Sequence, residues 1–280
     1  MNNEQILVKA SEIMKLKGFS PRTRKTYLYN TSRFMKYYGK DIKNATKTQL
    51  VEYVIGLIGR NLDESSIRQI VASLDFVFRE VLDKNVVSKE NFPRMKKKKQ
   101  LPKVLSKNEI EILLNNISNS KHRLMVSLMY SSGLRVSELV NLKIDDLDFE
   151  RSTIHVKYSK GKKDRITLLS ENLKEKLMNY ICKTDYKTVY LFESQRGTKY
   201  SVRTVEEIVK KASLIIGKHV CPHMFRHSFA THLLEDGVDI RYIQRLLGHS
   251  KLETTSIYTH VAKNSIENIR SPYDNLGLPR

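Results

Sequence analysis

The sequence has few cysteines, and it lacks both a signal peptide and a long apolar run, the features typical of extracellular and membrane proteins. Its 280 residues include only two cysteines, Cys182 and Cys221, and neither lies in a C-x-x-C motif, so a disulfide framework is excluded. The first ten residues lack the basic region and apolar core of a signal peptide. No apolar run approaches the roughly 20 residues that a membrane helix needs. We therefore expect a cytoplasmic protein of a reducing compartment, without a membrane association.

Acidic residues are outnumbered as well. The chain has 30 Asp and Glu against 50 Lys and Arg, which gives a formal net charge of +20 at pH 7. A charge of this sign and size favours a polyanionic partner, either nucleic acid or an anionic membrane surface. A lysine-rich surface that only keeps the protein soluble is the alternative. Of these interpretations we favour nucleic acid.

A lysine-rich stretch divides the chain. P-R-M-K-K-K-K-Q-L-P-K, residues 93–103, holds two prolines and six basic residues without an acidic one, and little in it could form a core. We interpret it as a linker between a helical domain, residues 1–92, and a second domain, residues 104–262, with a tail over 263–280. The linker is either a solvated spacer or a segment that lies along a phosphate backbone.

The first domain carries only helical patterns. Apolar periodicity predicts four helices, over residues 6–17, 21–38, 49–58 and 65–82. Gly18 ends the first, and Ser20 with Pro21 supplies an N-cap and a first-turn proline for the second. The second helix also interleaves aromatic with basic residues. Most of its aromatics are expected in the core, and its basic face is a candidate nucleic-acid surface.

The second domain mixes helices with a few short strands. Ser106, followed three residues later by Glu109, forms a capping box that opens a helix, and a further helix over 121–131 ends at Gly133. Three short runs are typical of strands: 153–158, 165–169 and 189–192. The first two flank S-K-G-K-K-D and predict a hairpin, and the third is expected to add an edge strand. The fold class is mainly α with a small antiparallel β-sheet.

Reactive side chains gather in five segments of the second domain. These are S-G-L-R-V-S-E-L (132–139), the hairpin turn with Lys160, C-P-H-M-F-R-H (221–227), L-L-G-H-S (246–250) and S-I-Y-T-H (256–260). Taken singly, each has an ordinary structural interpretation. Arg135 and Glu138 could form a helix-surface pair, and a turn lysine is normally exposed. A histidine after a helix-ending glycine is usually structural, and a tyrosine usually packs.

The segment C-P-H-M-F-R-H could serve either a metal or an anion. In a helix, His223 and His227 lie one turn apart on the same face, the spacing that zinc helices use. However, Met224 stands where H-E-x-x-H has its glutamate, and Arg226 would place a cation beside the metal. We therefore predict no metal site, with His223 and Arg226 as donors to one anion and His227 as a structural neighbour.

The candidate reactive side chains of the five segments are two arginines, Arg135 and Arg226, two histidines, His223 and His249, and one each of lysine, acid and tyrosine, namely Lys160, Glu138 and Tyr258. At a DNA phosphodiester, two arginine forks can stabilise the charge that grows in the pentacoordinate transition state. A tyrosine hydroxyl is an acceptable nucleophile, because its phosphate ester stores the bond energy for re-ligation. A lysine can protonate the departing 5′-oxygen. Such a set is complete for DNA strand transfer and needs no cofactor.

Five ordered blocks resemble the tyrosine recombinases of the integrase type, most of all the Xer branch. The blocks are S-G-L-R-V-S-E-L, S-K-G-K-K-D-R, H-M-F-R-H-S-F-A-T-H-L-L, I-Q-R-L-L-G-H-S and T-T-S-I-Y-T-H-V. The resemblance spans nearly the whole chain, and Phe225 stands where the family usually has leucine. It implies a C-shaped clamp around duplex DNA, made of a helical core-binding domain and a mostly α catalytic domain.

The resemblance implies how the site would hold a phosphate. Arg135 and Arg226 would clamp the scissile phosphate, and Glu138 would support the site without reacting. His223 would assist as an acid/base and phosphate donor. His249 would donate a hydrogen bond to the same phosphate.

The resemblance also implies the covalent chemistry. Tyr258 would attack the phosphate, form a covalent 3′-phosphotyrosine and free a 5′-hydroxyl. Lys160, on the hairpin, would protonate the leaving oxygen. His227 and His232 match positions that we interpret as structural. Neither a cofactor nor a metal is implied.

The implied partner is double-stranded DNA with an inverted-repeat recombination site, bound by a tetramer with or without a partner recombinase. The candidate DNA-binding residues are Arg22, Arg24, Lys25, Lys96, Lys97, Lys98, Lys99, Lys162 and Lys163. The biological reaction would be Xer-like dimer resolution, or integration and excision of a mobile element. Three alternatives are a type IB topoisomerase, a DNA-binding accessory protein without catalysis, and a histidine metalloenzyme.

The lysine run makes a first prediction about salt dependence. DNA binding should weaken steeply with added salt, because Lys and Arg contacts to phosphates release counterions. Replacing Lys96–Lys99 by alanine should flatten the plot of log affinity against log salt, as measured by fluorescence anisotropy. An unchanged slope would show that the run is only a spacer.

Overall fold

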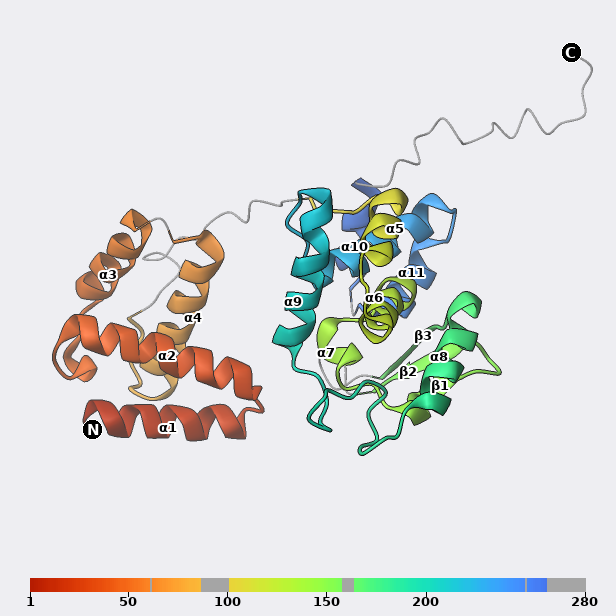
Figure 1. The fold of residues 1–280 in the computed structure, drawn as a ribbon. Coiled ribbons are helices and arrows are strands. Elements are labelled where there is room, and N and C mark those ends of the chain that lie inside the picture. Colours follow the sequence, from red (N-terminus) through yellow and green to blue (C-terminus); the bar gives the residue numbers. More distant parts are fainter. Residues whose placement is uncertain (61, 87–100, 158–163, 250, 261–280) are drawn as a thin grey trace, which may run out of the picture. The chain divides into compact units, whose positions relative to one another are not determined.

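The chain forms two compact units in the computed structural model, Met1–Lys99 and Gln100–Arg280 (Figure 1). The structure describes residues 1–60, 62–86, 101–157, 164–249 and 251–260. Most of the expected linker, including its lysine run, and the whole of the expected tail therefore lie outside the described residues. None of the helices in these described ranges is long and apolar enough to cross a membrane.

The first unit is all helical in its described residues. Its elements are α1 (Asn3–Leu16), α2 (Pro21–Tyr38), the short 3₁₀ turn η1 (Ile42–Asn44), α3 (Lys47–Gly59) and α4 (Glu64–Glu80). α2 packs against α4 around Phe34 and Phe78, which are fully buried. The N-cap of α2 is Ser20, as predicted. α1 begins three residues earlier than predicted, because Asn2 and Gln5 form a capping box.

Of the basic residues assigned to DNA contact, Arg22, Arg24 and Lys25 lie in the first two turns of α2. Arg22 and Lys25 are exposed there, whereas Arg24 is partly buried. The Tyr29 ring is 62% exposed, and the Arg33 guanidinium carbon lies 5.9 Å from its centroid. Basic and aromatic groups therefore share the exposed face of α2, while Phe34 and other aromatics of the helix pack inward.

In its described residues the second unit is mostly helical and contains a small sheet. Its helices are α5 (Lys107–Asn115), α6 (Ser120–Ser132), α7 (Val136–Leu139), α8 (Glu171–Lys183), α9 (Val202–Ser213), α10 (Pro222–Glu235) and α11 (Ile240–Leu247). The strands β1 (Leu147–Asp148), β2 (Thr153–Val156) and β3 (Arg165–Leu168) form an antiparallel sheet in that order. β2 and β3 are the two arms of the predicted hairpin. The expected fold class, mainly α with a small antiparallel sheet, is confirmed.

The third strand of the sheet is not the one that the sequence suggests. Residues 189–192 form only an isolated bridge, between Lys143 and Tyr190. The reason is that the Leu191 N–H donates to the Leu142 carbonyl, at 2.8 Å, so that this run pairs with the loop after α7. The prediction of an edge strand at 189–192 is therefore wrong, and β1 occupies the edge beside β2.

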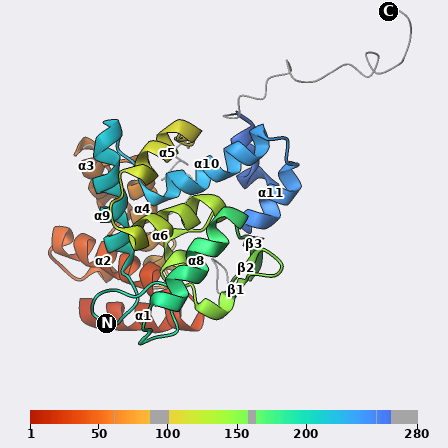
Figure 2. The same cartoon turned by 45° about the vertical axis from the view of Figure 1, so that its right-hand side comes forward.

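α6 carries much of the core of the second unit. It packs against α10 and α8 (Figure 2). Met125, Leu128 and Met129 on this helix are fully buried, and Ile154 of β2 joins the same cluster. As predicted, α6 ends at Gly133, which adopts the left-handed conformation with φ 59°. This turn leads the chain directly into the segment that carries Arg135.

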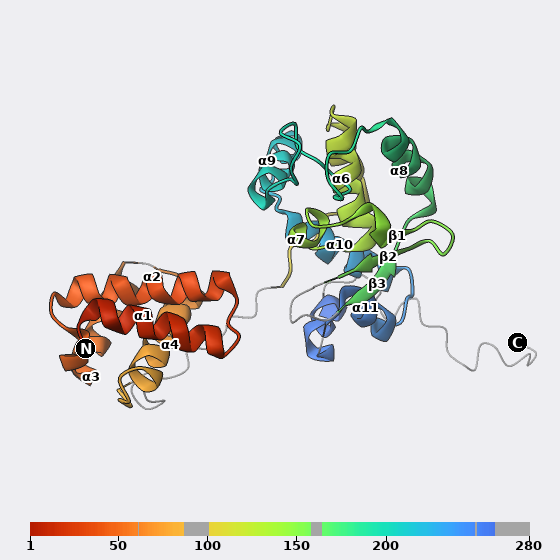
Figure 3. The same cartoon turned by 90° about the horizontal axis from the view of Figure 1, so that it is seen from below.

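β3 reverses the usual alternation of an amphipathic strand. Arg165 and Thr167 are buried, whereas Ile166 and Leu168 are 52% and 42% exposed. The strand runs beside α11 (Figure 3). Thr167 Oγ1 also donates to the Ser132 carbonyl at the end of α6, at 2.8 Å. Polar side chains of β3 are thereby placed inside the unit, where the ends of α6 and α11 meet the strand.

A smaller apolar cluster joins α10, α11 and the last described segment, the 3₁₀ turn η5 (Ser256–His260). Its buried members are Phe229, Ala230, Ile243, Leu247 and Tyr258. Tyr258 is only 2% exposed. The tyrosine that the sequence marks as reactive is therefore also a packing residue of this cluster.

Gly133 should be among the positions least tolerant of a larger residue. An added Cβ would lie 2.5 Å from Phe229 Cδ1, in a left-handed backbone conformation. Gly133→Ala should lose about 1–2 kcal/mol through the backbone conformation and about 1–3 kcal/mol through overpacking. Thermal and urea unfolding of the full chain measure the loss.

Gly217→Ala is the matched control, because Gly217 has nearly the same φ, 61°, and no atom within 4 Å of an added Cβ. It should lose only the conformational part. Equal losses in both variants would contradict the tight contact with Phe229.

Candidate active site

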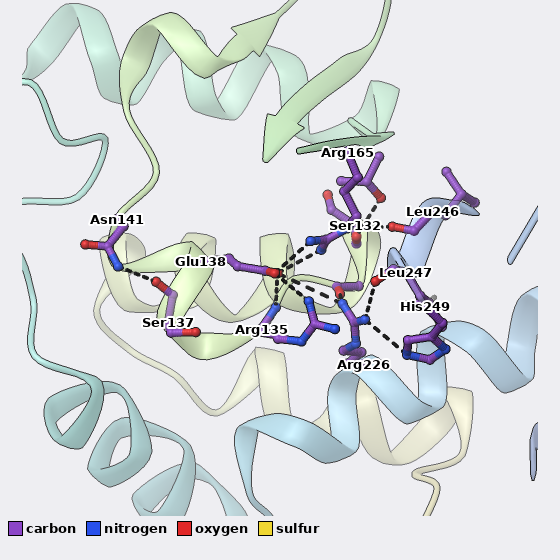
Figure 4. A network of polar contacts seen from close by, with 12 residues as sticks. Ser132, Arg135, Ser137, Glu138, Asn141, Arg165, Arg226, Leu246, Leu247 and His249 are labelled. Atoms are coloured by element: carbon purple, nitrogen blue, oxygen red, sulfur yellow. Dashed lines mark hydrogen bonds and ion pairs between the residues drawn. The ribbon is translucent and has the colours of Figure 1, made fainter. Parts of the chain in front are cut away.

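The candidate site lies where the ends of α6 and α11 meet α7, β3 and α10 (Figure 4). Arg135 is the N-cap residue of α7 and Glu138 is its third residue. Arg226 lies on α10, and His249 follows the helix-ending Gly248 of α11. Four of the predicted residues, from three separate segments of the chain, therefore meet in one polar network.

The centre of the network is the Glu138 carboxylate. Its Oε2 accepts from the Arg135 backbone N–H at 2.8 Å, and its Oε1 accepts from Arg135 Nη1 at 2.7 Å. Both oxygens also accept from Arg165, at 2.7 Å each. Burial opposes ionisation of Glu138, but the hydrogen bonds and charges of Arg165 and Arg135 prevail and lower its pKa to about 2.

Arg226 is held by backbone carbonyls. Its Nη1 donates to the Gly133 carbonyl at 2.6 Å, and its Nη2 donates to the Leu247 carbonyl at 2.5 Å. The residue is 1% exposed, and Nη1 lies 4.0 Å from Glu138 Oε2. Burial, together with the charges of Arg135 and Arg165, lowers the pKa of Arg226 to about 9. Burial is the larger of these causes, and repulsion by the two neighbouring guanidinium groups adds to it.

His249 connects Arg226 to the turn before the tyrosine. Arg226 Nη2 lies 3.3 Å from His249 Nε2, and His249 Nδ1 lies 2.9 Å from Thr255 Oγ1. Since a guanidinium can only donate, Nε2 is the acceptor and the ring proton lies on Nδ1. Burial and then the charge of Arg226 lower the pKa of His249 to about 4. The ring is therefore neutral at pH 7.

His227 contacts the candidate nucleophile. Its Nδ1 lies 3.0 Å from the Tyr258 hydroxyl, and its ring centroid lies 4.4 Å from that of His223. The sequence presents His227 only as a structural neighbour, and the structure adds this contact with the predicted nucleophile. Burial and then the charge of His223 lower its pKa to about 4, so at pH 7 the neutral ring pairs with the Tyr258 hydroxyl, as donor or acceptor according to its tautomer. Burial also raises the pKa of Tyr258.

His223 lies at the edge of this group. The residue is exposed, yet partial burial of the ring and the charges of Arg226 and Arg135 lower its pKa. Among the residues that the structure describes, no group of three His, Cys, Asp or Glu side chains could hold a metal ion. His223 and His227 thus have the spacing of a zinc helix without a third ligand nearby in those residues.

Several assigned residues cannot be placed. Lys160, Lys162 and Lys163 lie outside the described residues, as do the four lysines of the linker. His232 bonds the Tyr130 hydroxyl at 2.9 Å, which agrees with a structural role.

Sequence reasoning missed Arg165 and Thr255, both of which are buried. A signal for Arg165 exists in hindsight, since it ends the block S-K-G-K-K-D-R, but the apolar neighbours in R-I-T-L suggest that it points to solvent. Thr255 has no comparable signal, because the role of its hydroxyl follows only from its contact with His249, which the sequence does not reveal.

Comparison with known proteins assigns this arrangement to a family. The model described as "Phage integrase family" matches residues 103–265, and "Phage integrase, N-terminal SAM-like domain" matches residues 6–87. The "Tyrosine recombinase XerA" of Pyrococcus horikoshii is 38% identical over 264 residues, covering 92% of this chain and 90% of that protein.

Two solved structures are also similar. One is a crystal structure of a XerA recombinase, with 30% identity, a TM-score of 0.55 and 99% of both chains covered. Another is XerH bound to a palindromic difH substrate in a post-cleavage complex, with 25% identity and a TM-score of 0.75. That match covers 90% of this chain and 80% of the XerH chain. With both of its units matched, the chain belongs to the phage integrase family and is a tyrosine recombinase, an enzyme of DNA strand transfer.

Proposed function

We propose that this protein cuts and rejoins duplex DNA at an inverted-repeat site through a covalent link between Tyr258 and the 3′-phosphate. The observation that carries the proposal is the charge of the site. Three guanidinium groups, those of Arg135, Arg165 and Arg226, meet one carboxylate, which leaves two positive charges. A phosphodiester brings one negative charge, and more develops on its oxygens in the transition state, so this excess suits the reaction.

Within this proposal, Arg135 and Arg226 bind the non-bridging oxygens of the scissile phosphate. The Tyr258 hydroxyl attacks phosphorus, and the bond from phosphorus to the 5′-oxygen breaks. Lys160 gives its proton to that oxygen, and His223, as base, takes the proton that the Tyr258 hydroxyl loses and returns it as acid on religation. Religation reverses these steps on a new 5′-hydroxyl.

His249 would change its tautomer on binding DNA. In the free site its Nε2 accepts from Arg226 and cannot donate to a phosphate. Moving the ring proton from Nδ1 to Nε2 would let it donate. Thr255 makes this change inexpensive, because its hydroxyl can accept from Nδ1–H in one tautomer and donate to Nδ1 in the other.

Tyr258 would have to become accessible before it reacts. It is 2% exposed, packed in the cluster of α10, α11 and η5, and bonded to His227. A duplex phosphate cannot reach a hydroxyl in that position. We therefore interpret this arrangement as a resting form, which DNA or a neighbouring protomer of the proposed tetramer releases.

The covalent step is tested with a nicked duplex that carries the cognate site, incubated with the full chain in EDTA. The unmodified protein should form a covalent adduct that is visible by denaturing gel. Tyr258→Phe should abolish the adduct and keep DNA binding, because only the nucleophilic oxygen is lost. Tyr242→Phe is the control, since Tyr242 is a 62% exposed tyrosine on nearby α11.

An adduct in Tyr258→Phe would show that another residue is the nucleophile, and a strict metal requirement would revive the metalloenzyme alternative. Processive relaxation of supercoiled DNA, without recombination between two sites, would favour the topoisomerase alternative.

The lowered histidine pKa values predict how pH affects the free protein. His227 and His249 have pKa values of about 4 in the fold, against about 6.5 in an unfolded chain. The unfolded chain binds protons below about pH 6.5 that the folded protein does not bind until about pH 4. The free energy of unfolding should therefore fall as pH drops through this range.

Urea unfolding between pH 7.5 and pH 4.5 measures the effect. His227→Asn should make the fall less steep, because the amide can occupy the position of Nδ1 without titrating in this range. The exposed His155 on β2 provides His155→Asn as the control for loss of a histidine. Identical pH profiles for His227→Asn and the unmodified protein would show that the lowered pKa of His227 does not contribute to the fall in the free energy of unfolding.

A further inference from the structure

Arg165 is the buried residue of the site to which no role has yet been given. It is the first residue of β3, and its side chain is 4% exposed. All three of its guanidinium nitrogens are engaged: Nη1 and Nη2 donate to the two oxygens of Glu138, and Nε donates to the Leu246 carbonyl at 2.8 Å (Figure 4). With both ends of its fork on Glu138, Arg165 cannot clamp a phosphate, so any effect on the reaction acts through its neighbours.

The first such effect concerns the charge of Glu138. Arg165 binds both carboxylate oxygens in the parallel two-bond geometry that makes the strongest pair between arginine and a carboxylate. Arg135 shares one of these oxygens through its side chain, and Arg226 lies 4.0 Å from the other. If Arg165 were uncharged, the carboxylate would be free to pair more closely with the two arginines that are proposed to hold DNA.

The second effect concerns the end of α11. The Leu246 carbonyl, which Arg165 holds, is adjacent to the Leu247 carbonyl, which holds Arg226. The next residue is Gly248, where an added Cβ would lie 2.7 Å from Arg165 Cδ. The Arg165 side chain therefore packs directly on the turn that leads into His249, and it fixes this turn to β3.

We propose that Arg165 is a positioning residue, the counter-ion that occupies the Glu138 carboxylate so that Arg135 and Arg226 stay available for the scissile phosphate. In addition, it fastens the His249 turn to β3. This inference rests on the proposed function, because it takes Arg135 and Arg226 as the phosphate-binding groups. It makes a specific prediction: removing the charge of Arg165 slows adduct formation mainly because the charge of Glu138 remains.

The test compares Arg165→Met, Glu138→Gln and the double variant in the full chain. The readout is the rate of adduct formation on the nicked duplex, with affinity for the intact duplex measured separately. Arg165→Met should lower the rate by about 100-fold, the size expected when catalytic groups shift by about 1 Å. Duplex affinity should change by less than about 3-fold, since most phosphate contacts are elsewhere.

The double variant decides the inference. Neutralising Glu138 removes the charge that would pair with Arg135, so the double variant should form the adduct at least about 10-fold faster than Arg165→Met. A double variant as slow as Arg165→Met, or slower, would mean that Arg165 only supports the fold and would overturn the proposal. So would a rate for Arg165→Met within about 3-fold of the unmodified protein.

Arg165→Lys covers the case in which Arg165→Met fails to fold. Lysine keeps the charge but cannot bind both carboxylate oxygens side by side. Its rate should fall less than that of Arg165→Met, and adding Glu138→Gln should not restore it, because the charge of Glu138 is still balanced. Restoration in that pair would contradict the charge argument. Arg151→Met, at an exposed arginine just before β2, is the control for loss of an arginine.

A second measurement separates this inference from the proposed function. The thermal midpoint is recorded with inorganic phosphate and with chloride at equal ionic strength, because a ligand that binds the fold raises the midpoint. The rise caused by phosphate should shrink in Arg165→Met and return in the double variant, whether or not Tyr258 cuts DNA. An absent adduct with this pattern intact would overturn the proposed function alone. The same rise in all variants would overturn the role of Arg165.

Discussion

One buried carboxylate holds the arrangement of the site together. Glu138 is surrounded by three guanidinium groups from α7, β3 and α10, and each occupies a defined position relative to it. Burying this many like charges is unfavourable, as the lowered pKa of Arg226 indicates. The Glu138 carboxylate and the backbone carbonyls compensate part of the positive charge of the three arginines. The remainder is the positive charge that attracts an anion.

The tyrosine segment depends on two histidines in the same way. His249 lies within hydrogen-bond distance of Thr255, and His227 lies within hydrogen-bond distance of Tyr258. Both η5 and the turn before it therefore contact a histidine ring whose pKa is lowered by arginine charge. Both rings stay neutral because they are largely buried and, in addition, because Arg226 or His223 lies close to them. A phosphate that neutralises the arginines would change the protonation preferences of both rings. The electrostatics of the anion site and the position of the tyrosine are thus linked through short contacts.

Much of the secondary structure could be predicted from the sequence because it depends on local signals. The caps at Ser20 and Ser106, the helix end at Gly133 and the hairpin arms are all determined by residues within a few positions of each other. The reactive set was also recognisable, since its blocks have a characteristic order.

The features that could not be predicted from the sequence depend on contacts between distant segments. In R-I-T-L the apolar residues point outward and Arg165 and Thr167 point inward. The reason is that the ends of α6 and α11 offer carbonyls, and α7 offers the Glu138 carboxylate, instead of an apolar surface. Periodicity alone cannot reveal such a surface. For the same reason the bond between His227 and Tyr258, 31 positions apart, and the pairing of residues 189–192 with the loop after α7 were not foreseen.

The way in which Arg226 is held has a consequence for how such an enzyme can change over time. Besides His249 and Glu138, Arg226 has two main-chain carbonyl partners, at Gly133 and Leu247, and these two contacts need no particular side chain to orient it. Substitutions that leave the backbone path intact can therefore accumulate around this arginine without moving it. The vulnerable positions are instead two left-handed glycines beside the site, Gly133 and Gly248, where a side chain would meet Phe229 or Arg165. Evolutionary freedom at this site should be limited by backbone shape more than by the chemistry of the surrounding residues.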